Sequence, residues 1–308
     1  MTTSFGIIII GDEILSGKRA DKHLPKTIEL LKARGLALSY ADYVGDDPAR
    51  ITATLARAFA AARASGDVVF SCGGIGATPD DHTRQCAAAA LGVGLALHPQ
   101  AKTLITSRMQ DVAKEQGVAF EPDRHDNVHR LNMGVFPTGA QIIPNPYNKI
   151  PGFSCFVERQ ESPSQQGPRD WFGQNAGAAV SSGGSDLHEV GERGGLHFLP
   201  GFPVMAWPMI EWVLDTHYSH LHQTEAYIEK SIIVFGSMEA TLTPLMLDIE
   251  ASHPGVKVFS LPSVDHATYG RHIELGVKGA PDAVAVAYPA LLAGLGNFDY
   301  PLGPELVR

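Results

Sequence analysis

The sequence predicts a doubly wound α/β domain, with a mostly parallel sheet between two helix layers (αβα), followed by a small α+β unit. Apolar runs typical of buried strands alternate with helical patterns over the first part of the chain. A glycine-rich loop follows one of these strands. From about residue 225 the order of elements changes to strand, helix, strand, strand, helix. These three observations together indicate two domains.

The first strand is expected at residues 5–10, an unbroken apolar and β-branched run. Such a run is typical of a strand that is buried on both faces of a parallel sheet. Apolar residues then repeat at helical spacing from Leu24 to Leu31, and Gly35 lies where a left-handed residue would end that helix. Residues 36–44 have the pattern of a second strand.

The clearest helix follows Asp47-Pro48, where an N-cap residue precedes proline at the first helical position. Gly66 ends this helix, and residues 67–71 form a third strand. A glycine loop then leads to another helix that ends near Gly92. The remaining expected elements of this domain are a helix near 100–116, strands at 141–143, 152–157 and 196–199, and a helix from 203 or 204 to about 216.

The domain boundaries follow from composition. We expect a first domain over residues 1–220, interrupted at 159–194 by a surface loop that is rich in Ser, Gly and Gln. A second, smaller α+β domain is expected over residues 225–300, and residues 301–308 are interpreted as a tail.

Charge and cysteine usage exclude several classes of function. The chain has 24 Lys and Arg against 33 Asp and Glu, a net charge of −9, which disfavours nucleic acid as a partner. Its 3 cysteines are scattered, as expected in a reducing compartment, so we expect a cytoplasmic protein. No apolar stretch approaches the roughly 20 residues of a membrane span, so no membrane partner is expected.

The strongest local signal is the segment Ser71-Cys-Gly-Gly-Ile-Gly-Ala-Thr-Pro-Asp-Asp-His-Thr83, which follows a strand and opens a helix. Gly73, Gly74 and Gly76 would let the backbone approach an anion closely. Free N–H groups and the positive end of the helix attract phosphate there. In open α/β sheets, ligands bind at this edge.

Two carboxylates, Asp80 and Asp81, follow this glycine loop. They would repel a phosphate unless a divalent cation lay between them, which suggests a metal-bridged phosphate ligand. The alternative is a capping box, with Thr78 as the N-cap of the helix and Asp81 reaching back to it.

A second acidic segment, Gly11-Asp12-Glu13, follows the first strand and should lie at the same edge of the sheet. A plain turn would also explain it. Together with Asp80 and Asp81, however, Asp12 would offer oxygen ligands of the kind that Mg²⁺ prefers.

Four motifs in order resemble the molybdopterin-binding domain of the CinA competence/damage-inducible protein family. They are Gly11-Asp-Glu-Ile-Leu-Ser-Gly17, Gly73-Gly-Ile-Gly-Ala-Thr-Pro-Asp-Asp-His-Thr83, Pro151-Gly-Phe153 and Leu199-Pro-Gly-Phe-Pro203. The N-terminal domain of eukaryotic FAD synthases is similar. The resemblance covers about residues 4–216, and it implies that the second domain is KH-like.

The resemblance also implies roles for individual residues. Asp81 would be the catalytic or metal-binding carboxylate, with Asp12 as its partner across the cleft, and a divalent ion (Mg, Mn or Co) would be held by Asp12, Asp80 and Asp81. The residues that would contact the substrate are Gly11, Gly73, Gly74, Gly76, Thr78, Thr83, Gly201 and Pro203. No haem, flavin prosthetic group or nicotinamide cofactor is implied.

The activity implied by these relatives is metal-dependent hydrolysis of a dinucleotide pyrophosphate such as ADP-ribose or FAD. Two alternatives stay open: a transferase that resembles molybdopterin adenylyltransferases, and a non-catalytic nucleotide or pterin binder. The chain departs from the family pattern at His23, where asparagine is usual, and at Val204 and Met205, where an acidic residue is usual. Relatives of this fold commonly form dimers or trimers, so a homo-oligomer is expected.

Two weaker patterns have structural explanations as well. His217, His220 and His222 lie within six residues of each other and could ligate a transition metal, although no carboxylate or cysteine completes the set. The aromatic residues Phe202, Trp207 and Trp212 could stack on a flavin or adenine, but packing in the core is the favoured interpretation.

Overall fold

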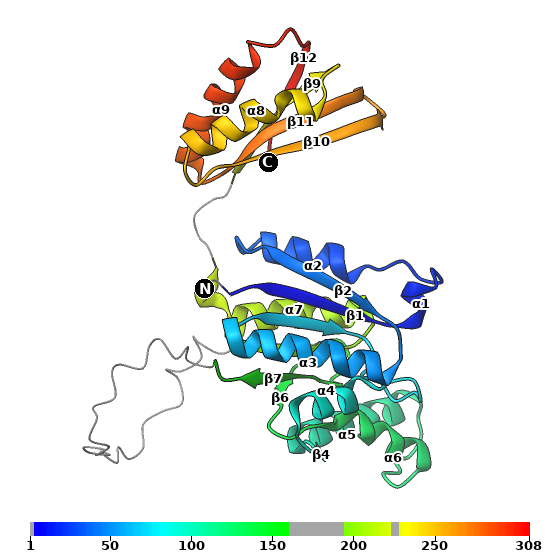
Figure 1. Cartoon of the computed structure of the whole chain (residues 1–308). Coiled ribbons are helices and arrows are strands. Elements are labelled where there is room, and N and C mark those ends of the chain that lie inside the picture. The colour runs from blue at the N-terminus through cyan, green and yellow to red at the C-terminus, as the bar shows by residue number, and fades with distance from the viewer. Residues whose placement is uncertain (1–2, 160–193, 223–227) are drawn as a thin grey trace, which may run out of the picture. The chain divides into compact units, whose positions relative to one another are not determined.

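The computed structural model describes residues 3–159, 194–222 and 228–308. The chain divides into two compact units, residues 1–222 and 223–308 (Figure 1). The loop predicted at 159–194 lies, except for its two end residues, outside the described residues. Within the described ranges, no helix has the length and apolar character needed to cross a membrane.

The first unit alternates strands and helices over most of its length. In chain order its elements are β1 (Phe5–Ile10), α1 (Asp12–Leu15), α2 (His23–Lys32), β2 (Leu38–Val44), α3 (Pro48–Ser65), β3 (Val68–Cys72), α4 (Thr83–Leu91), β4 (Leu95–Leu97), α5 (Pro99–Glu115), α6 (His125–Leu131), the 3-10 turn η1 (Asn132–Gly134), β5 (Val135–Pro137), β6 (Gln141–Ile143), β7 (Gly152–Val157), β8 (Gly194–Leu199), α7 (Pro203–His217) and the 3-10 turn η4 (Ser219–Leu221).

The main sheet of this unit has the strand order β2-β1-β3-β8-β7-β6. β1 pairs in parallel with both β2 and β3, and β3 pairs in parallel with β8. β7 is antiparallel to both of its neighbours, so it alone runs against the other strands of this sheet. The order reverses direction at β1, and the crevice between β1 and β3 is therefore the topological switch point where such sheets bind ligands.

Alternating residues of β1 and β3 enter two separate cores, as expected for strands that are covered on both faces. Ile8, Ile10 and Val69 pack with α3, α4 and α5 on one face. Ile7 and Phe70 pack with α2 and α7 on the other face. The three-layer αβα prediction for this unit is confirmed.

The start of α3 shows how local sequence sets these boundaries. The side chain of Asp47 accepts the N–H of Arg50 at 2.7 Å, and Pro48 occupies the first helical position. Gly66 ends the helix with a left-handed backbone (φ 76°). The start at Asp47-Pro48 and the end at Gly66 both agree with the prediction from the sequence.

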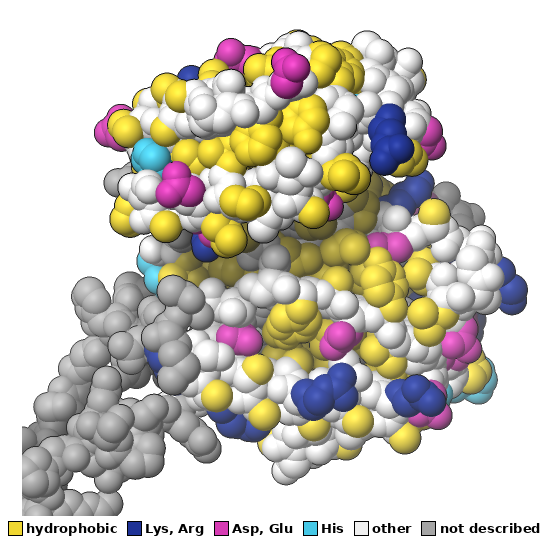
Figure 2. Space-filling view, turned by 45° about the horizontal axis from the view of Figure 1, so that its top comes forward, with side chains coloured by type: hydrophobic (Ala, Val, Ile, Leu, Met, Phe, Trp, Pro, Cys, Tyr) yellow, Lys and Arg dark blue, Asp and Glu magenta, His cyan; other side chains and the backbone are white. Residues whose placement is uncertain are grey.

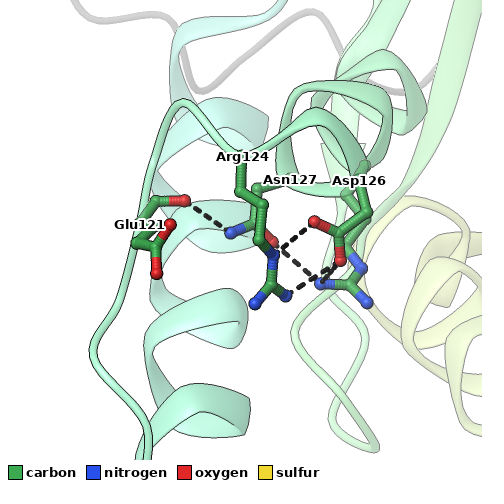
Figure 3. A network of polar contacts seen from close by, with 5 residues as sticks. Glu121, Arg124, Asp126 and Asn127 are labelled. Carbon is green, nitrogen blue, oxygen red and sulfur yellow. Dashed lines mark hydrogen bonds and ion pairs between the residues drawn. The ribbon is translucent and has the colours of Figure 1, made fainter.

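The short helix α6 is held by its own polar contacts (Figure 3). The guanidinium of Arg124 donates two hydrogen bonds to Asp126, at 2.6 and 2.9 Å. The side-chain amide of Asn127 donates to the backbone carbonyl of Glu121 at 2.7 Å, and Arg130 donates to Asn127 at 2.8 Å. No side chain caps the N-terminus of this helix, and the bond from Asn127 to Glu121 ties its first turn to the preceding loop.

The second unit contains β9 (Ile228–Phe235), α8 (Glu239–Ser252), β10 (Lys257–His266), β11 (Gly270–Gly279), α9 (Pro281–Leu295) and β12 (Leu302–Val307). Its sheet has the order β10-β11-β9-β12, and every neighbouring pair is antiparallel. This order with a β-α-β-β-α-β sequence of elements is the ferredoxin-like arrangement. One face of the sheet packs on α8 and α9 through a core that includes Val234, Leu275 and Leu291.

One expectation for this unit is wrong, and another is not confirmed. Residues 301–308 are not a tail, because residues 302–307 form β12 on the open edge of β9. The fourth strand completes the ferredoxin-like order, and the expected KH-like character is not confirmed. Arg308 reinforces this edge, since its guanidinium bonds both carboxylate oxygens of Glu274 at 2.6 and 3.2 Å.

Large apolar side chains lie on the surface of the second unit, where Figure 2 shows them as yellow patches. The most exposed are Val264 at 74%, and Leu247, Val286 and Val307 at 65% each. Isolated apolar residues on a surface are ordinary, so these exposures alone assign no role.

A polar network lies inside the first unit, between β7, β8 and α7. His197 is fully buried; its Nδ1 is 2.8 Å from the Ser154 hydroxyl, and its Nε2 is 2.9 Å from the Tyr218 hydroxyl. Burial, with a smaller contribution from His217, lowers the pKa of His197 to about 3. The imidazole is therefore neutral at pH 7, where both of its nitrogens serve the network.

This network predicts a specific loss of stability in acid. A buried histidine with a lowered pKa stabilises the fold fully above its unfolded pKa of 6.5, and this contribution is lost as the pH falls from 6.5 towards 3. We expect the free energy of unfolding of the wild type to fall, relative to that of His197→Gln, by about 1.4 kcal/mol per pH unit within this window. Urea unfolding followed by tryptophan fluorescence measures it, because all 3 tryptophans belong to the first unit.

Equal slopes for the wild type and His197→Gln would contradict a buried neutral imidazole.

Candidate functional site

The loops that follow β1, β3 and β8 meet at one edge of the main sheet. The N–H of Gly11 donates to the carbonyl of Val44 at 3.0 Å, and the N–H of Gly73 donates to the carbonyl of Leu199 at 3.0 Å. A Cβ on Gly201 would lie 3.5 Å from the Cα of Gly73. The backbone of the loop after β3 is therefore in contact with the end of β8.

The antiparallel strand β7 begins at this edge, because it runs against its neighbours. Gly152, its first residue, has no room for a side chain: a Cβ would lie 2.4 Å from the carbonyl oxygen of Phe198. The sequence motifs at 151–153 and 199–203 are thus brought together, one by the start of a strand and the other by the end of its neighbour.

The glycine loop is packed against β1 so closely that its conformation depends on glycine. Gly73 has a φ of 111°, and a Cβ there would lie 2.1 Å from the carbonyl oxygen of Ile10. Gly74 has a φ of 68°, and its Cβ would lie 2.2 Å from Oγ1 of Thr83. The glycines of this loop were expected to let a ligand approach the backbone closely. In the structure, the end of β1 makes this close approach to Gly73.

Thr83 joins the loop to the start of α4. Its buried hydroxyl donates to the carbonyl of Gly73 at 3.0 Å, and its N–H donates to the carbonyl of Gly74 at 3.0 Å. The N-cap residue is His82, and its side chain makes no hydrogen bond to the backbone of the helix. The positive end of α4 therefore lies directly behind the glycine loop.

The alternative of a capping box at 78–81 holds only in part: Asp81 reaches back to Thr78, but Thr78 is not the N-cap of the helix. The helix begins at Thr83, and residues 79–80 form a turn. Oδ2 of Asp81 accepts two hydrogen bonds from Thr78, from the N–H at 2.8 Å and from the hydroxyl at 2.6 Å. Thr78 thus orients the carboxylate of Asp81 instead of capping the helix. A Cβ on Gly76 would lie 2.5 Å from the same oxygen, so the Asp81 side chain lies against the glycine loop.

Four carboxylates from three strand ends form what we call the acidic corner: Asp12, Glu13, Asp46 and Asp80. The N–H of Asp12 donates to Oδ2 of Asp46 at 2.9 Å, and the N–H of Asp46 donates to Oδ1 of Asp12 at 3.2 Å. Burial raises the pKa of Asp46; the hydrogen bond from Asp12 opposes this, and the charges of Asp12, Glu13 and Asp80 raise it further. Asp80 therefore lies close enough to Asp46 to act on it.

Asp46 was not identified from the sequence. It follows β2 as Gly45-Asp46, in the same way that Gly11-Asp12 follows β1, and a Cβ on Gly45 would lie 2.4 Å from Oδ1 of Asp12. The same strand-end argument that singled out Asp12 would have found Asp46.

The acidic corner has the oxygen donors that a hard divalent cation prefers. Within the part of the chain that the structure describes, however, no three His, Cys, Asp or Glu side chains are grouped so as to hold a metal ion. One oxygen of Asp81 is held by Thr78, and one oxygen of Asp12 by Asp46. The predicted group of Asp12, Asp80 and Asp81 is therefore no preformed cage. Mg²⁺ commonly binds one or two carboxylates together with phosphate oxygens of the ligand, and this arrangement has the residues for that mode.

A hollow of about 340 Å³ opens at the same edge, on the α2 and α7 side. Its lining includes Gly201 and Pro203, which the family resemblance places among the substrate contacts, and also His23 and Phe202. Its remaining lining is Ile9, Ile10, Glu13, Ile14, Arg19, Ala20, Lys22 and Cys72. The glycine loop and this hollow are contiguous, because Gly201 lies against Gly73.

Other candidates lie away from this edge or have structural roles. His217, His220 and His222 form no metal-binding group among the described residues. Trp212 packs against the core formed with α2 and α7, as the favoured interpretation predicted. Phe202 does not: it is 56% exposed. A larger hollow, of about 510 Å³, is lined by Val157 and lies at the opposite end of β7 and β8 from the glycine loop.

These features define a class: a doubly wound α/β domain whose glycine loop and acidic strand ends meet at the topological switch point. A comparison with protein families identifies the family. Residues 6–220 match the family described as "Probable molybdopterin binding domain". Because the match covers well over half of the chain, the chain belongs to this family.

Curated relatives are CinA-like proteins. One from Anaeromyxobacter sp. (strain K) is 33% identical over 153 residues, which are 50% of this chain and 34% of the relative. One from Mycobacterium tuberculosis (strain ATCC 25177 / H37Ra) is 25% identical over 285 residues, which are 91% of this chain and 56% of the relative. The chain thus spans only a third to somewhat over half of the length of these relatives.

A solved structure, the protein CinA from Thermoplasma acidophilum, is also similar. It is 22% identical, with a TM-score of 0.47 over 70% of this chain and 97% of that chain.

The contact between Gly73 and Ile10 predicts a severe effect of Gly73→Ala. The added Cβ combines a strained φ with a clash against backbone, so we expect a loss of about 3 kcal/mol or more in the free energy of unfolding. Gly117→Ala is the matched control: its φ is also positive, at 68°, but no atom lies within 4 Å of its Cβ. That variant should lose only about 1–2 kcal/mol. Urea unfolding would show equal losses if the loop could move away from β1.

Proposed function

We propose that the first unit binds a phosphate-bearing nucleotide or pterin at the edge formed by the glycine loop and the acidic corner. We further propose that it hydrolyses the pyrophosphate bond of a dinucleotide such as ADP-ribose or FAD with the help of a divalent ion. The observation that carries the proposal is the position of the glycine loop, which lies at the switch point between β1 and β3 and directly before the positive end of α4. Backbone N–H groups there attract an anion without any side-chain charge.

The acidic corner favours a pyrophosphate over a single anion as the ligand at this edge of the sheet. Without a cation, the carboxylates of Asp12, Asp46 and Asp80 would repel a phosphate next to the loop. When bound, a divalent ion would supply neutralisation of the phosphate oxygens and a more acidic water. Hydrogen bonds orient one oxygen of each carboxylate of Asp12 and Asp81. In this proposal the other oxygen of each would bind the ion or accept a proton from water.

Two other functions have their own support. The family description favours a pterin ligand, and hence a transferase similar to molybdopterin adenylyltransferases, which would need ATP together with a pterin. The lack of a preformed metal group in the described residues, with Val204 and Met205 at the start of α7, favours a non-catalytic binder. Binding without turnover would be the signature of that third function.

A screen of ADP-ribose, FAD and related dinucleotides with Mg²⁺, Mn²⁺ or Co²⁺ tests hydrolysis. We expect release of AMP, measured by chromatography, and a fall in kcat/KM of about 100-fold or more in Asp12→Asn and in Asp81→Asn, as for loss of a general base or electrostatic group. The exposed Asp123, on the loop before α6, gives the control variant Asp123→Asn, which should keep full activity.

Turnover that requires ATP together with a pterin would contradict the proposed hydrolase and support the transferase. Tight binding of ADP-ribose with no AMP release in the presence of any of the three metals would support the third function, a non-catalytic binder.

A further inference from the structure

Two histidines on the short helix α6 bring their ring nitrogens together. His125 and His129 are separated by four positions, which places them on the same face of the helix, and both are exposed. Nε2 of His129 lies 3.1 Å from Nε2 of His125. The ring centroids are 4.3 Å apart, with an angle of 71° between the ring planes. Each ring thus presents its Nε2 to the other ring at the surface of the helix.

The separation of the two nitrogens is that of a metal chelate. Zn²⁺ binds imidazole nitrogen at about 2.0–2.1 Å, and similar ions bind at comparable distances. Two nitrogens that bind one such ion at an angle of roughly 90–110° therefore lie about 2.9–3.4 Å apart. The observed distance of 3.1 Å falls within this range, so the backbone of α6 already holds the two ligands at the spacing that one ion requires.

A hydrogen bond between the two rings is the simplest other explanation of this contact. Two neutral imidazoles can be this close when one Nε2 carries a hydrogen and the other accepts it, since two lone pairs would repel each other. Such a bond between exposed groups contributes only modestly to stability, because water competes for both rings. A metal ion that replaces the one shared hydrogen would bind both lone pairs without a change in the helix.

Polar contacts around α6 hold the backbone that carries the two rings (Figure 3). The buried amide of Asn127 donates to the carbonyl of Glu121 at 2.7 Å. Asp126, the acidic residue in the first turn, forms ion pairs with Arg124 at 2.6 Å and with Arg130 at 3.2 Å. Two arginines therefore engage the carboxylate of this helix, and the two imidazoles are the metal ligands that its exposed face offers.

We propose that His125 and His129 form a two-histidine chelate for a transition-metal ion of the kind that binds imidazole: Cu²⁺, Ni²⁺, Co²⁺ or Zn²⁺. No three His, Cys, Asp or Glu side chains are grouped as a metal site in the part of the chain that the structure describes, so water fills the other coordination positions. The bound ion closes a ring across one turn of α6 and stabilises a helix of only 7 residues.

This chelate differs in chemistry from the acidic corner. The acidic corner offers carboxylate oxygens, which suit a hard ion such as Mg²⁺, whereas two imidazole nitrogens select the later transition metals. Neither histidine belongs to the acidic corner or lines the hollow beside the glycine loop. The chelate does not rest on the proposed function.

Titration calorimetry of the full chain with Ni²⁺, in a large excess of Mg²⁺ that occupies oxygen-rich sites, tests the chelate. We expect the tightest Ni²⁺ site to weaken about tenfold or more in His125→Gln and equally in His129→Gln, because loss of either ring removes the second, intramolecular bond to the ion. In the wild type, Cu²⁺ should bind more tightly than Ni²⁺, and Ni²⁺ more tightly than Co²⁺.

His220→Gln is the matched control. His220 is also exposed and belongs to the other group of histidines, near the end of α7. Its loss should leave the Ni²⁺ affinity unchanged, which separates the chelate on α6 from binding by the group at 217–222.

Two further readouts distinguish a metal ligand from a histidine that only stabilises the helix. Electron paramagnetic resonance of the chain with one equivalent of Cu²⁺ should show coupling to two imidazole nitrogens in the wild type and to fewer in either variant. Amide hydrogen exchange within α6 should slow when Ni²⁺ is added to the wild type or to His220→Gln, but not when it is added to His125→Gln or His129→Gln.

Three results would overturn the chelate: no binding of Ni²⁺ or Cu²⁺ to the wild type, equal affinities in the wild type and both α6 variants, or a loss that follows His220→Gln instead. None of these readouts uses turnover or a nucleotide, so the chelate can fail while the proposed hydrolysis stands, and the reverse also holds.

Discussion

The site depends on one close contact, that of the glycine loop with the end of β1. The carbonyl of Ile10 occupies the space that any side chain at residue 73 would need. Because the loop is pressed there, its N–H reaches Leu199 on β8, and its carbonyls accept the two hydrogen bonds of Thr83. Three strand ends and one helix start are thus fixed relative to each other by backbone contacts and by the hydroxyl of Thr83. Backbone fixed in this way is a rigid support for a ligand.

Charge imposes a second constraint on the same edge. Asp12 and Asp46 bind each other's N–H groups, which fixes two like charges side by side. Burial raises the pKa of Asp46, and the charges of Asp12, Glu13 and Asp80 raise it further. Carboxylates held together against their repulsion are common at functional sites.

The sequence was sufficient for those parts of the fold that local rules determine. The buried run at 5–10, the cap at Asp47 and the glycine loop all have local signatures, and each was predicted at its place. The capping box was predicted correctly only in part: Asp81 does reach back to the N–H of Thr78, but this pair lies in a turn before α4, which begins at Thr83. Asp46 was missed because the helix-start signal of Asp47-Pro48 dominates its neighbourhood. β12 was missed because Gly303 and Pro304 interrupt its pattern, and the strand forms only by pairing with β9, about 70 residues earlier, around an irregularity in register.

The reversed direction of β7 has a consequence for how this fold can change. Val157, the last residue of β7, pairs with Gly194, the first residue of β8, and this pair lies at the end of the sheet away from the glycine loop. A chain that leaves and re-enters the sheet at paired positions can be shortened to a tight turn or extended by a whole module at a small cost in loop-closure entropy. The connection between β7 and β8 is thus a position at which residues can be inserted or removed. Relatives can differ there in length and composition without change to the residues at the opposite end of the sheet.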